Sequence, residues 1–226
     1  MQTVERWLPR LEKESRSNPK LKPQYQAIQE TKEFLDSGTP LFNKDENWKI
    51  INLEYLKELQ LLSSKPIIYV FNVSEQTLAN TTKKQNLANL VLPNKALFIC
   101  AKLEDELRGL DEIDRKEMLA SYGQNTSGLN QIIHTAYDIL GLQSYLTAGQ
   151  KEVRAWTINK GATAPQAAGI IHGDFEKGFI AAQIVNYDDL VTAGNEQAAK
   201  AAGKVRTEGK TYIMQPDDVV EFRFNV

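Results

Sequence analysis

The sequence predicts an α/β domain followed by a smaller α+β domain, with a helical hairpin in front of both. Three observations predict this order. Apolar residues recur at helical spacing in the first forty residues, two short uninterrupted apolar runs alternate with helix-compatible segments, and strand-like segments surround one helix in the last third.

The first forty residues carry two helical segments. The first has apolar side chains at helical spacing, namely Val4, Trp7, Leu8 and Leu11. After a polar stretch from Ser15 to Pro23, a second helical run begins at Gln24 and stops at Gly38, with Pro40 behind it. Because the apolar stripe is thin, we expect the arms to pack on each other like a short antiparallel coiled coil. An ordinary core-facing pair of helices fits the spacing equally well.

The middle of the chain alternates between helices and apolar runs. A helix is expected from Asp45 to Leu62, and strands are expected over residues 65–72 and 96–100, each followed by a helix. Strands that are apolar throughout are typical of a parallel sheet covered on both faces. In such sheets, ligands bind at the carboxyl ends of the strands.

The last third changes pattern after a helix that Ser127 caps and Gly141 ends. The strands predicted beyond it are Val153 to Ile158, Ala181 to Asn186, Thr211 to Met214 and Val219 to Asn225. One helix near residues 165–172 would pack on this sheet, which favours a β-grasp. We therefore divide the chain into a hairpin (1–40), a partial α/β domain (41–140) and a β-grasp domain (141–226).

Composition excludes several classes of function. The formal net charge of -2 and the pI near 5.8 give no overall attraction to nucleic acid or anionic membranes. With one cysteine, Cys100, and two histidines, neither a disulfide framework nor a metal site is expected. Glu5 and Arg6 stand where a secretory signal would be apolar, and no run approaches the roughly 18 apolar residues of a spanning helix. We expect a cytoplasmic protein with no membrane partner.

Two short motifs follow the two predicted strands. Asn72-Val73-Ser74-Glu75 occupies the place of the N-K-x-D tetrapeptide with which GTPase-type P-loop proteins read the base. Cys100-Ala101-Lys102 occupies the place of S-A-K, whose backbone amides meet the base in the same proteins. Either motif alone also fits a plain strand-to-helix turn. Together, on consecutive strand ends, they predict half of a base pocket.

Longer blocks resemble the YchF or Obg-like ATPase family. The first block is residues 65–75, KPIIYVFNVSE, and it is followed by AKLE at residues 101–104. The more specific block lies in the last third and resembles the family's TGS domain. It comprises GLQSY at 141–145, KEVRAWT at 151–157, GATAPQAAG at 161–169, IHGDFE at 171–176 and the end FRFNV at 222–226.

The resemblance implies a function and a set of site residues. The family binds and hydrolyses ATP in preference to GTP with Mg²⁺, associates with ribosomes, and is linked to translation and stress responses. Carried over by position, Asn72, Val73 and Glu75 would recognise adenine, and Cys100, Ala101 and Lys102 would supply the second half of the pocket. Cys100 stands where the family has serine, a small change where the backbone contacts the base.

One element of ATP chemistry is missing from these 226 residues. No G-x-x-x-x-G-K-[ST] stretch is present, and the nearest sequence, from Gly203 to Thr211, has five residues between its glycines. We expect the chain to be the later part of such an ATPase, with no catalytic residue, no firmly bound ATP or Mg²⁺, and no hydrolysis on its own. An incomplete sheet would leave an apolar face through which copies of the chain pair.

Two basic clusters are candidates for contact with RNA or the ribosome. One contains Lys200, Lys204, Arg206 and Lys210, and the other, near the hairpin tip, contains Arg16, Lys20 and Lys22. The leading hypothesis is a partial YchF-like ATP-binding translation or stress factor that associates with ribosomes. The alternative is a non-enzymatic RNA- or ribosome-binding adaptor that uses the hairpin and the TGS domain, and a third is an incomplete product with no role of its own. For His172 we expect a structural role at a helix end.

Overall fold

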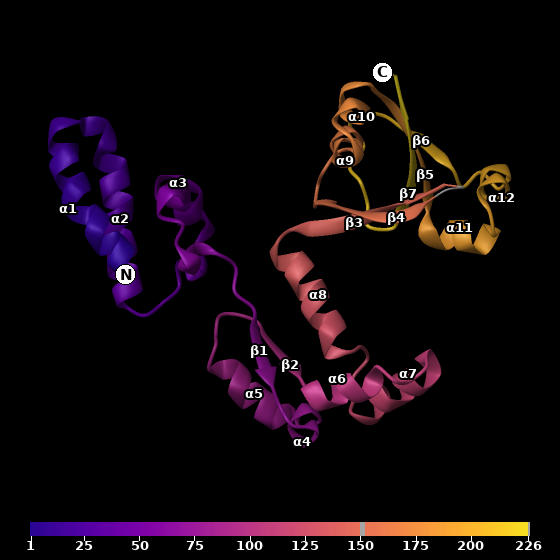
Figure 1. Cartoon of the computed structure of the whole chain (residues 1–226), viewed down its shortest axis with the longest axis horizontal. Coiled ribbons are helices and arrows are strands. Elements are labelled where there is room, and N and C mark those ends of the chain that lie inside the picture. Colours follow the sequence, from indigo (N-terminus) through magenta and orange to yellow (C-terminus); the bar gives the residue numbers. More distant parts are fainter. Residues whose placement is uncertain (150–151, 226) are drawn as a thin grey trace. The chain divides into compact units, whose positions relative to one another are not determined.

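The computed structural model describes residues 1–149 and 152–225 (Figure 1). It divides into two compact units, Met1–Ile133 and His134–Val226. Lys151 and Val226, which belong to the blocks quoted above, lie outside the described residues. The division into 1–40, 41–140 and 141–226 remains a prediction. Within the described ranges, no helix is both long and apolar enough to cross a bilayer.

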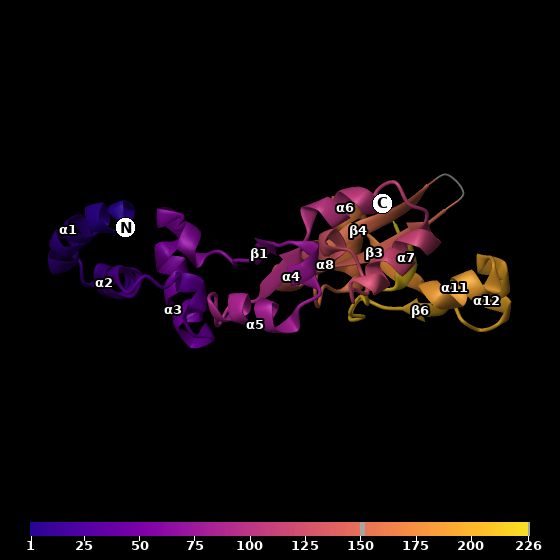
Figure 2. The ribbon, with the colours of Figure 1, turned by 90° about the horizontal axis from the view of Figure 1, so that it is seen from below.

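The hairpin is formed by α1 (Gln2–Ser17), the 3-10 turn η1 (Pro19–Leu21) and α2 (Lys22–Asp36). The two helices lie side by side and run in opposite directions (Figures 1 and 2). Val4 and Leu11 of α1 are buried with Ala27 and Ile28 of α2, which confirms the predicted pair. Residues of the next segments join this core, so the hairpin base also packs on η2 (Leu41–Asn43), α3 (Glu46–Leu56) and η3 (Lys57–Leu59).

The third helix and the first strand are both shorter than predicted. The α-helix ends at Leu56, and after η3 the chain turns at Gln60, whose φ of 45° is left-handed. A further 3-10 turn, η4 (Leu62–Ser64), follows, and strand β1 begins only at Tyr69. Pro66 interrupts the predicted strand, since proline has no N–H to donate to a neighbouring strand.

Two parallel strands form the sheet of the first unit. These are β1 (Tyr69–Asn72) and β2 (Ala96–Ile99), with Phe71 paired to Phe98, and α4 (Glu75–Leu78) and α5 (Thr81–Asn89) connect them. No residue of either strand is fully buried, so the expectation of a sheet covered on both faces is wrong for the described chain. After β2 come α6 (Ala101–Leu107), α7 (Glu112–Ser121) and α8 (Gly128–Ile139). The Ser127 hydroxyl accepts from the Asn130 N–H at 3.2 Å, as predicted for a cap.

A five-stranded mixed sheet with the order β4-β3-β7-β5-β6 forms the second unit. Its strands are β3 (Leu142–Ala148), β4 (Val153–Asn159), β5 (Phe179–Asn186), β6 (Arg206–Glu208) and β7 (Asp218–Phe224). The β3–β7 pair is parallel and the other pairs are antiparallel. Helix α9 (Ala164–Ile171) buries Ala164, Ala167 and Ala168 in the core of this sheet, which is the β-grasp arrangement expected.

One predicted strand of this unit is wrong. Thr211 to Met214 forms only an isolated bridge between Thr163 and Ile213. The segment runs along the turn before α9 instead of joining the sheet, because Met214 N donates to the carbonyl of Ala162 and Ala164 N donates to that of Tyr212. Strand β3, whose buried face includes the polar Gln143, was not predicted from the sequence. Strand β6 and three short helices, α10 (Gly173–Lys177), α11 (Tyr187–Ala193) and α12 (Glu196–Ala201), were not predicted either.

Candidate functional site

The two predicted base-reading motifs meet at one edge of the first unit. Parallel pairing places Asn72 opposite Ile99, so the segments that follow β1 and β2 leave the sheet together. The Asn72 side-chain oxygen accepts from the Ala101 N–H at 3.1 Å. The Val73 N–H donates to the Ile99 carbonyl at 2.8 Å. These two bonds fix the separation between the motifs.

An ion pair closes the same site. The Lys102 ammonium lies 2.9 Å from a carboxylate oxygen of Glu75 and 3.6 Å from Glu106. The hydrogen bond and the charge of Glu75, and then the charge of Glu106, raise the pKa of Lys102. The Glu75 side chain is 28% exposed and the Lys102 side chain is 72% exposed, so a carboxylate and a cation stand side by side at a solvent-accessible edge.

A cavity of about 640 Å³ lies between the motifs, and residues 72–76 and 100–102 line it. All six predicted base-site residues are therefore brought together. Cys100 is only 5% exposed and packs in an apolar cluster with Leu78 and Leu103. Ser74 and Gln76 also line the cavity and were not among the predicted site residues. Gln76 occupies no position of the tetrapeptide, and only its place at the start of α4 brings it to the cavity.

The carboxy-terminal basic cluster is spread over several elements. Lys200 lies in α12, Lys204 lies in the loop before β6, Arg206 lies in β6 and Lys210 lies in the turn after it. Two of these cations have acidic partners: Lys204 is 3.1 Å from Asp189, and Arg206 is 3.7 Å from Asp218 and 3.8 Å from Glu208. The Arg206 guanidinium also lies over the Tyr212 ring, 5.7 Å from its centroid.

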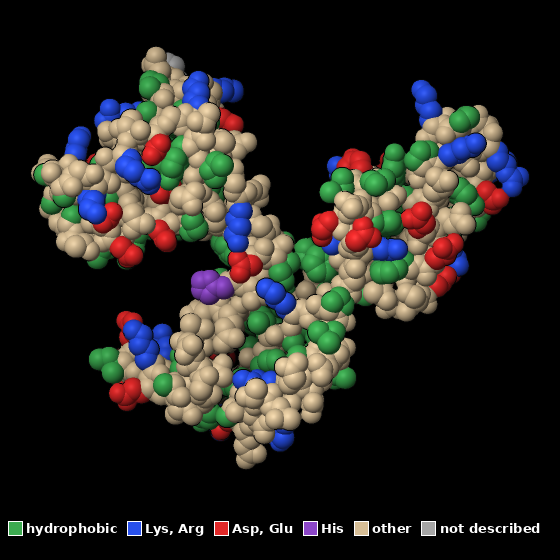
Figure 3. Space-filling model, turned by 180° about the vertical axis from the view of Figure 1, so that it is seen from behind, with side chains coloured by type: hydrophobic (Ala, Val, Ile, Leu, Met, Phe, Trp, Pro, Cys, Tyr) green, Lys and Arg blue, Asp and Glu red, His purple; other side chains and the backbone are tan. Residues whose placement is uncertain are grey.

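The other basic cluster lies where α1 passes into α2. Arg16 is 2.7 Å from Glu12, whereas Lys20 and Lys22 form no ion pair with any residue that the structure describes. Lys and Arg side chains gather at this end of the hairpin (Figure 3). The two predicted basic clusters thus lie in different units.

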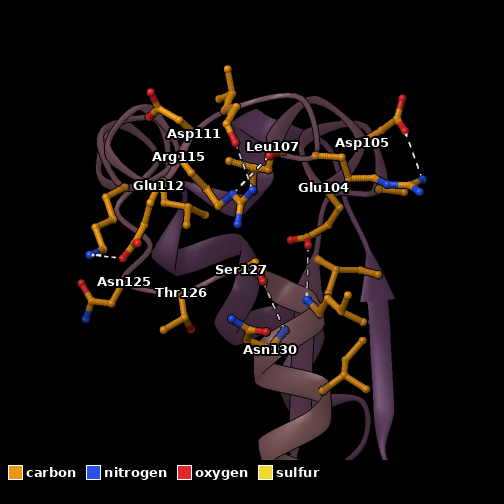
Figure 4. A pocket seen from close by; sticks show the side chains of 18 residues that line it. Glu104, Asp105, Leu107, Asp111, Glu112, Arg115, Asn125, Thr126, Ser127 and Asn130 are labelled. Atoms are coloured by element: carbon orange, nitrogen blue, oxygen red, sulfur yellow. Dashed lines mark hydrogen bonds and ion pairs between the residues drawn. The ribbon is translucent and has the colours of Figure 1, made fainter. Parts of the chain in front are cut away.

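A larger cavity, of about 1190 Å³, lies between α6, α7 and the start of α8 (Figure 4). Several of its polar side chains already have partners. Glu104 accepts from the backbone N–H groups of Gly128 at 2.6 Å and Leu129 at 3.3 Å, which satisfies the amino end of α8. Arg115 donates to the carbonyls of Leu107 and Leu110. The polar groups of this cavity therefore hold α6, α7 and α8 together.

The described residues contain no candidate metal centre, and His172 has a structural role. No group of three or more His, Cys, Asp or Glu side chains is placed to hold a metal ion there. The His172 ring nitrogen Nδ1 accepts from the Asp174 N–H at 3.2 Å, so this histidine caps α10. That is the structural role expected for it.

Known proteins resemble this chain along its whole length. Residues 142–225 match the YchF-GTPase_C family model, described as a protein of unknown function (DUF933). The "Ribosome-binding ATPase YchF" of Bacillus subtilis (strain 168) is 42% identical over 235 residues, which cover 100% of this chain and 63% of the relative. The "Obg-like ATPase 1" of Caenorhabditis elegans is 37% identical, over 93% of this chain and 54% of the relative.

A solved structure supports the same assignment. The YchF GTPase of Schizosaccharomyces pombe superimposes with a TM-score of 0.79 at 33% identity, over 98% of this chain and 61% of that protein. The chain thus spans about six tenths of the length of these relatives. The family model matches most of the β-grasp unit. The relatives that align with nearly the whole of this chain also match its hairpin and its two-stranded sheet. The chain is thus similar over its whole length to members of the YchF and Obg-like ATPase family, and its last third matches the family's carboxy-terminal model.

Proposed function

We propose that the chain carries the base-recognition half of an adenine-nucleotide site in a YchF-like, ribosome-associated ATP-binding factor. The observation that supports this proposal is the meeting of two motifs in one cavity, with Asn72 bonded to Ala101 and Glu75 paired to Lys102. These residues are 29 and 27 positions apart in sequence, so a plain turn after each strand does not account for the contacts.

The chemistry of the cavity suits a base with an exocyclic amino group. A carboxylate only accepts hydrogen bonds, and adenine offers its amino group as a donor. With one Glu75 oxygen engaged by Lys102, the other oxygen would accept from this donor. Val73, in place of the lysine of N-K-x-D, adds an apolar wall without a second charge. In this proposal Asn72 positions the loop of Ala101 and does not itself contact the base.

Binding of phosphate and magnesium needs groups other than those of the proposed base site. The 226 residues contain no phosphate-binding G-x-x-x-x-G-K-[ST] loop, and the described part of the chain offers no metal-ligand cluster. When bound in a complete site, ATP and Mg²⁺ supply the phosphoryl-transfer chemistry. This chain alone is proposed to hold the base weakly and to hydrolyse nothing. Magnesium-dependent phosphate release by the purified chain, above a buffer control, contradicts this part of the proposal.

Nucleosides test the base site directly, because they need no phosphate contacts. In an NMR titration of the chain, adenosine should shift the amides of Ala101 and Glu75 more than guanosine does. Lys102→Met removes an exposed ion pair and should weaken adenosine binding by up to about fivefold, the equivalent of roughly 1 kcal/mol. Arg108→Met is the matched control, since Arg108 lies just after α6 and forms an exposed ion pair with Asp105 at 3.9 Å. Equal response to both nucleosides counts against the proposal.

The second candidate function is that of a non-enzymatic adaptor for the ribosome or its RNA. Several relatives are named ribosome-binding ATPases, which supports a ribosomal partner and agrees with the cytoplasmic location proposed for this chain. Cosedimentation of the chain with ribosomes, without ATP and with ATP at a concentration that saturates the weak base site, separates the two functions. A nucleotide-dependent factor should change its ribosome occupancy with ATP, whereas an adaptor should not.

A further inference from the structure

The two basic clusters differ in how many of their cations are free to meet an anion. Residues 15–29, which include Arg16, Lys20 and Lys22, contain no aspartate or glutamate. Only Arg16 has an ion pair there, and its side chain remains 77% exposed. In the carboxy-terminal cluster, Lys204 and Arg206 are both neutralised by carboxylates. Nearby carboxylates therefore neutralise less of the positive charge at the hairpin tip than in the carboxy-terminal cluster, although the tip has fewer cations.

The tip is also held in place. Asn18 accepts from the Lys20 N–H at 3.2 Å and starts η1, and Pro19 and Pro23 restrict the backbone on either side. Below the tip, the buried Leu11 and Ile28 lock α1 to α2. Lys20 and Lys22 are thus displayed from a fixed turn, which lowers the entropy lost when a ligand orders their side chains.

Side chains near the tip also indicate what kind of partner it fits. From residue 2 to residue 49 of the described chain, no large hydrophobic side chain is exposed. A tip without an apolar anchor is poorly suited to insertion into a lipid surface, and it offers no aromatic hot spot to a protein. Its exposed polar groups, Ser17, Asn18 and Gln26, instead suit phosphate oxygens and ribose hydroxyls.

We infer that the hairpin tip, through Lys20, Lys22 and Arg16, binds the phosphate backbone of duplex RNA without regard to sequence. The wide, shallow minor groove of A-form RNA exposes its phosphates and 2′-hydroxyls to a blunt two-helix end of this kind. This inference rests on the proposed ribosome association, because that association is the reason for choosing RNA over DNA as the ligand. It assigns no RNA contact to the carboxy-terminal cluster.

Fluorescence anisotropy of the full chain with a labelled RNA duplex of about 16 base pairs, across a salt series, tests the inference. The variant Lys20→Ala with Lys22→Ala should lower the slope of log affinity against log salt by roughly two units, at about 0.9 per phosphate contact. At about 0.1 M salt this loss corresponds to binding weaker by on the order of 60-fold. Lys20→Arg with Lys22→Arg should bind like the wild type, which separates loss of charge from loss of fold.

Lys200→Ala with Lys210→Ala is the matched control, because it removes the same charge from exposed lysines that form no ion pair in the described residues. Its slope and affinity should equal those of the wild type. The inference is overturned if the tip variant binds normally, if the control loses as much, or if the wild type binds anionic vesicles and not the duplex. Wild-type cosedimentation with ribosomes, measured beside the duplex assay, shows separately whether the proposed ribosome association holds.

Discussion

At the residue scale, side chains from distant parts of the sequence hold the proposed base site together. Asn72 reaches the backbone of Ala101, and Lys102 reaches Glu75, so each motif positions the other. Glu75 and Val73 are the positions at which the tetrapeptide differs from N-K-x-D. Base preference should therefore depend on these two side chains more than on Asn72.

Exchanging both residues should change the preferred base. Val73→Lys with Glu75→Asp recreates N-K-x-D and should move preference from adenosine toward guanosine by about 1–3 kcal/mol, since a polar match to the base is gained or lost. Isothermal or NMR titration with both nucleosides measures the ratio. Unchanged discrimination in the double variant, with the fold intact by circular dichroism, would show that these residues do not read the base.

Tyr145 makes the folding stability of the second unit depend on pH. Its ring is fully buried, and its hydroxyl donates to the Ala167 carbonyl at 2.9 Å. Burial raises the pKa of the Tyr145 phenol above its ordinary value of about 10. The folded protein therefore keeps a proton that the unfolded chain releases. The resulting stability is complete below about pH 10 and is lost as the pH rises toward the folded-state pKa.

Tyr145→Phe should flatten this dependence. At pH 8 the variant should lose about 0.5–1.5 kcal/mol with the hydrogen bond, while its decline above about pH 10 should be shallower by up to roughly 1.4 kcal/mol per pH unit. Urea unfolding at several pH values measures both effects. Tyr187→Phe, at an exposed tyrosine, controls for removal of a hydroxyl. A variant with the wild-type slope refutes the assignment to Tyr145.

At the element scale, the backbones of two segments of the β-grasp unit lie so close together that only glycine fits at one position. At the start of β5, a Cβ added to Gly178 would overlap the carbonyl of Asn225, just beyond β7. The two residues are joined by a hydrogen bond of 2.9 Å from Asn225 N to the Gly178 carbonyl. Only glycine allows the end of β7 to approach β5 this closely.

Gly178→Ala should therefore separate the ends of β5 and β7. We expect a loss of about 1–3 kcal/mol of unfolding free energy, the usual cost of overpacking when backbone must move. Gly173→Ala is the control, because a Cβ there meets no atom within 4 Å. Urea unfolding should show the control within about 0.5 kcal/mol of the wild type. Equal effects of the two substitutions would contradict the packing argument.

The whole molecule consists of two units with separate cores. The second unit, residues 134–226, has its own buried cluster around Tyr145, Phe179 and Ile184. A fragment of these residues should fold alone, because its sheet and its covering helix lie within one unit. A single cooperative urea transition, with native-like dispersion of amide signals, is the expected result. A disordered fragment would show that the unit depends on the rest of the chain.

The first unit should behave differently, because its two-stranded parallel sheet exposes apolar side chains. Val70 is 40% exposed, and Leu129 and Ile133 at the nearby start of α8 are 59% and 46% exposed. We expect the full chain to bind a hydrophobic dye and to associate as its concentration rises. Light scattering over a dilution series measures the association. A monomer at all concentrations that binds no dye contradicts this expectation.

The sequence by itself determined the fold class and the resemblance to the YchF and Obg-like ATPase family, and it predicted which residues form the proposed base site. Apolar periodicity located the hairpin, and strand-end motifs located the six candidate residues, because both signals are local. Only the tertiary structure decided what these residues touch. Lys102 pairs with Glu75, and carboxylates neutralise Lys204 and Arg206. Thr211 to Met214 runs beside the turn before α9. Each of these contacts joins residues that are distant along the chain or lie in different elements. Such contacts depend on how elements pack, and no local pattern of side chains encodes them.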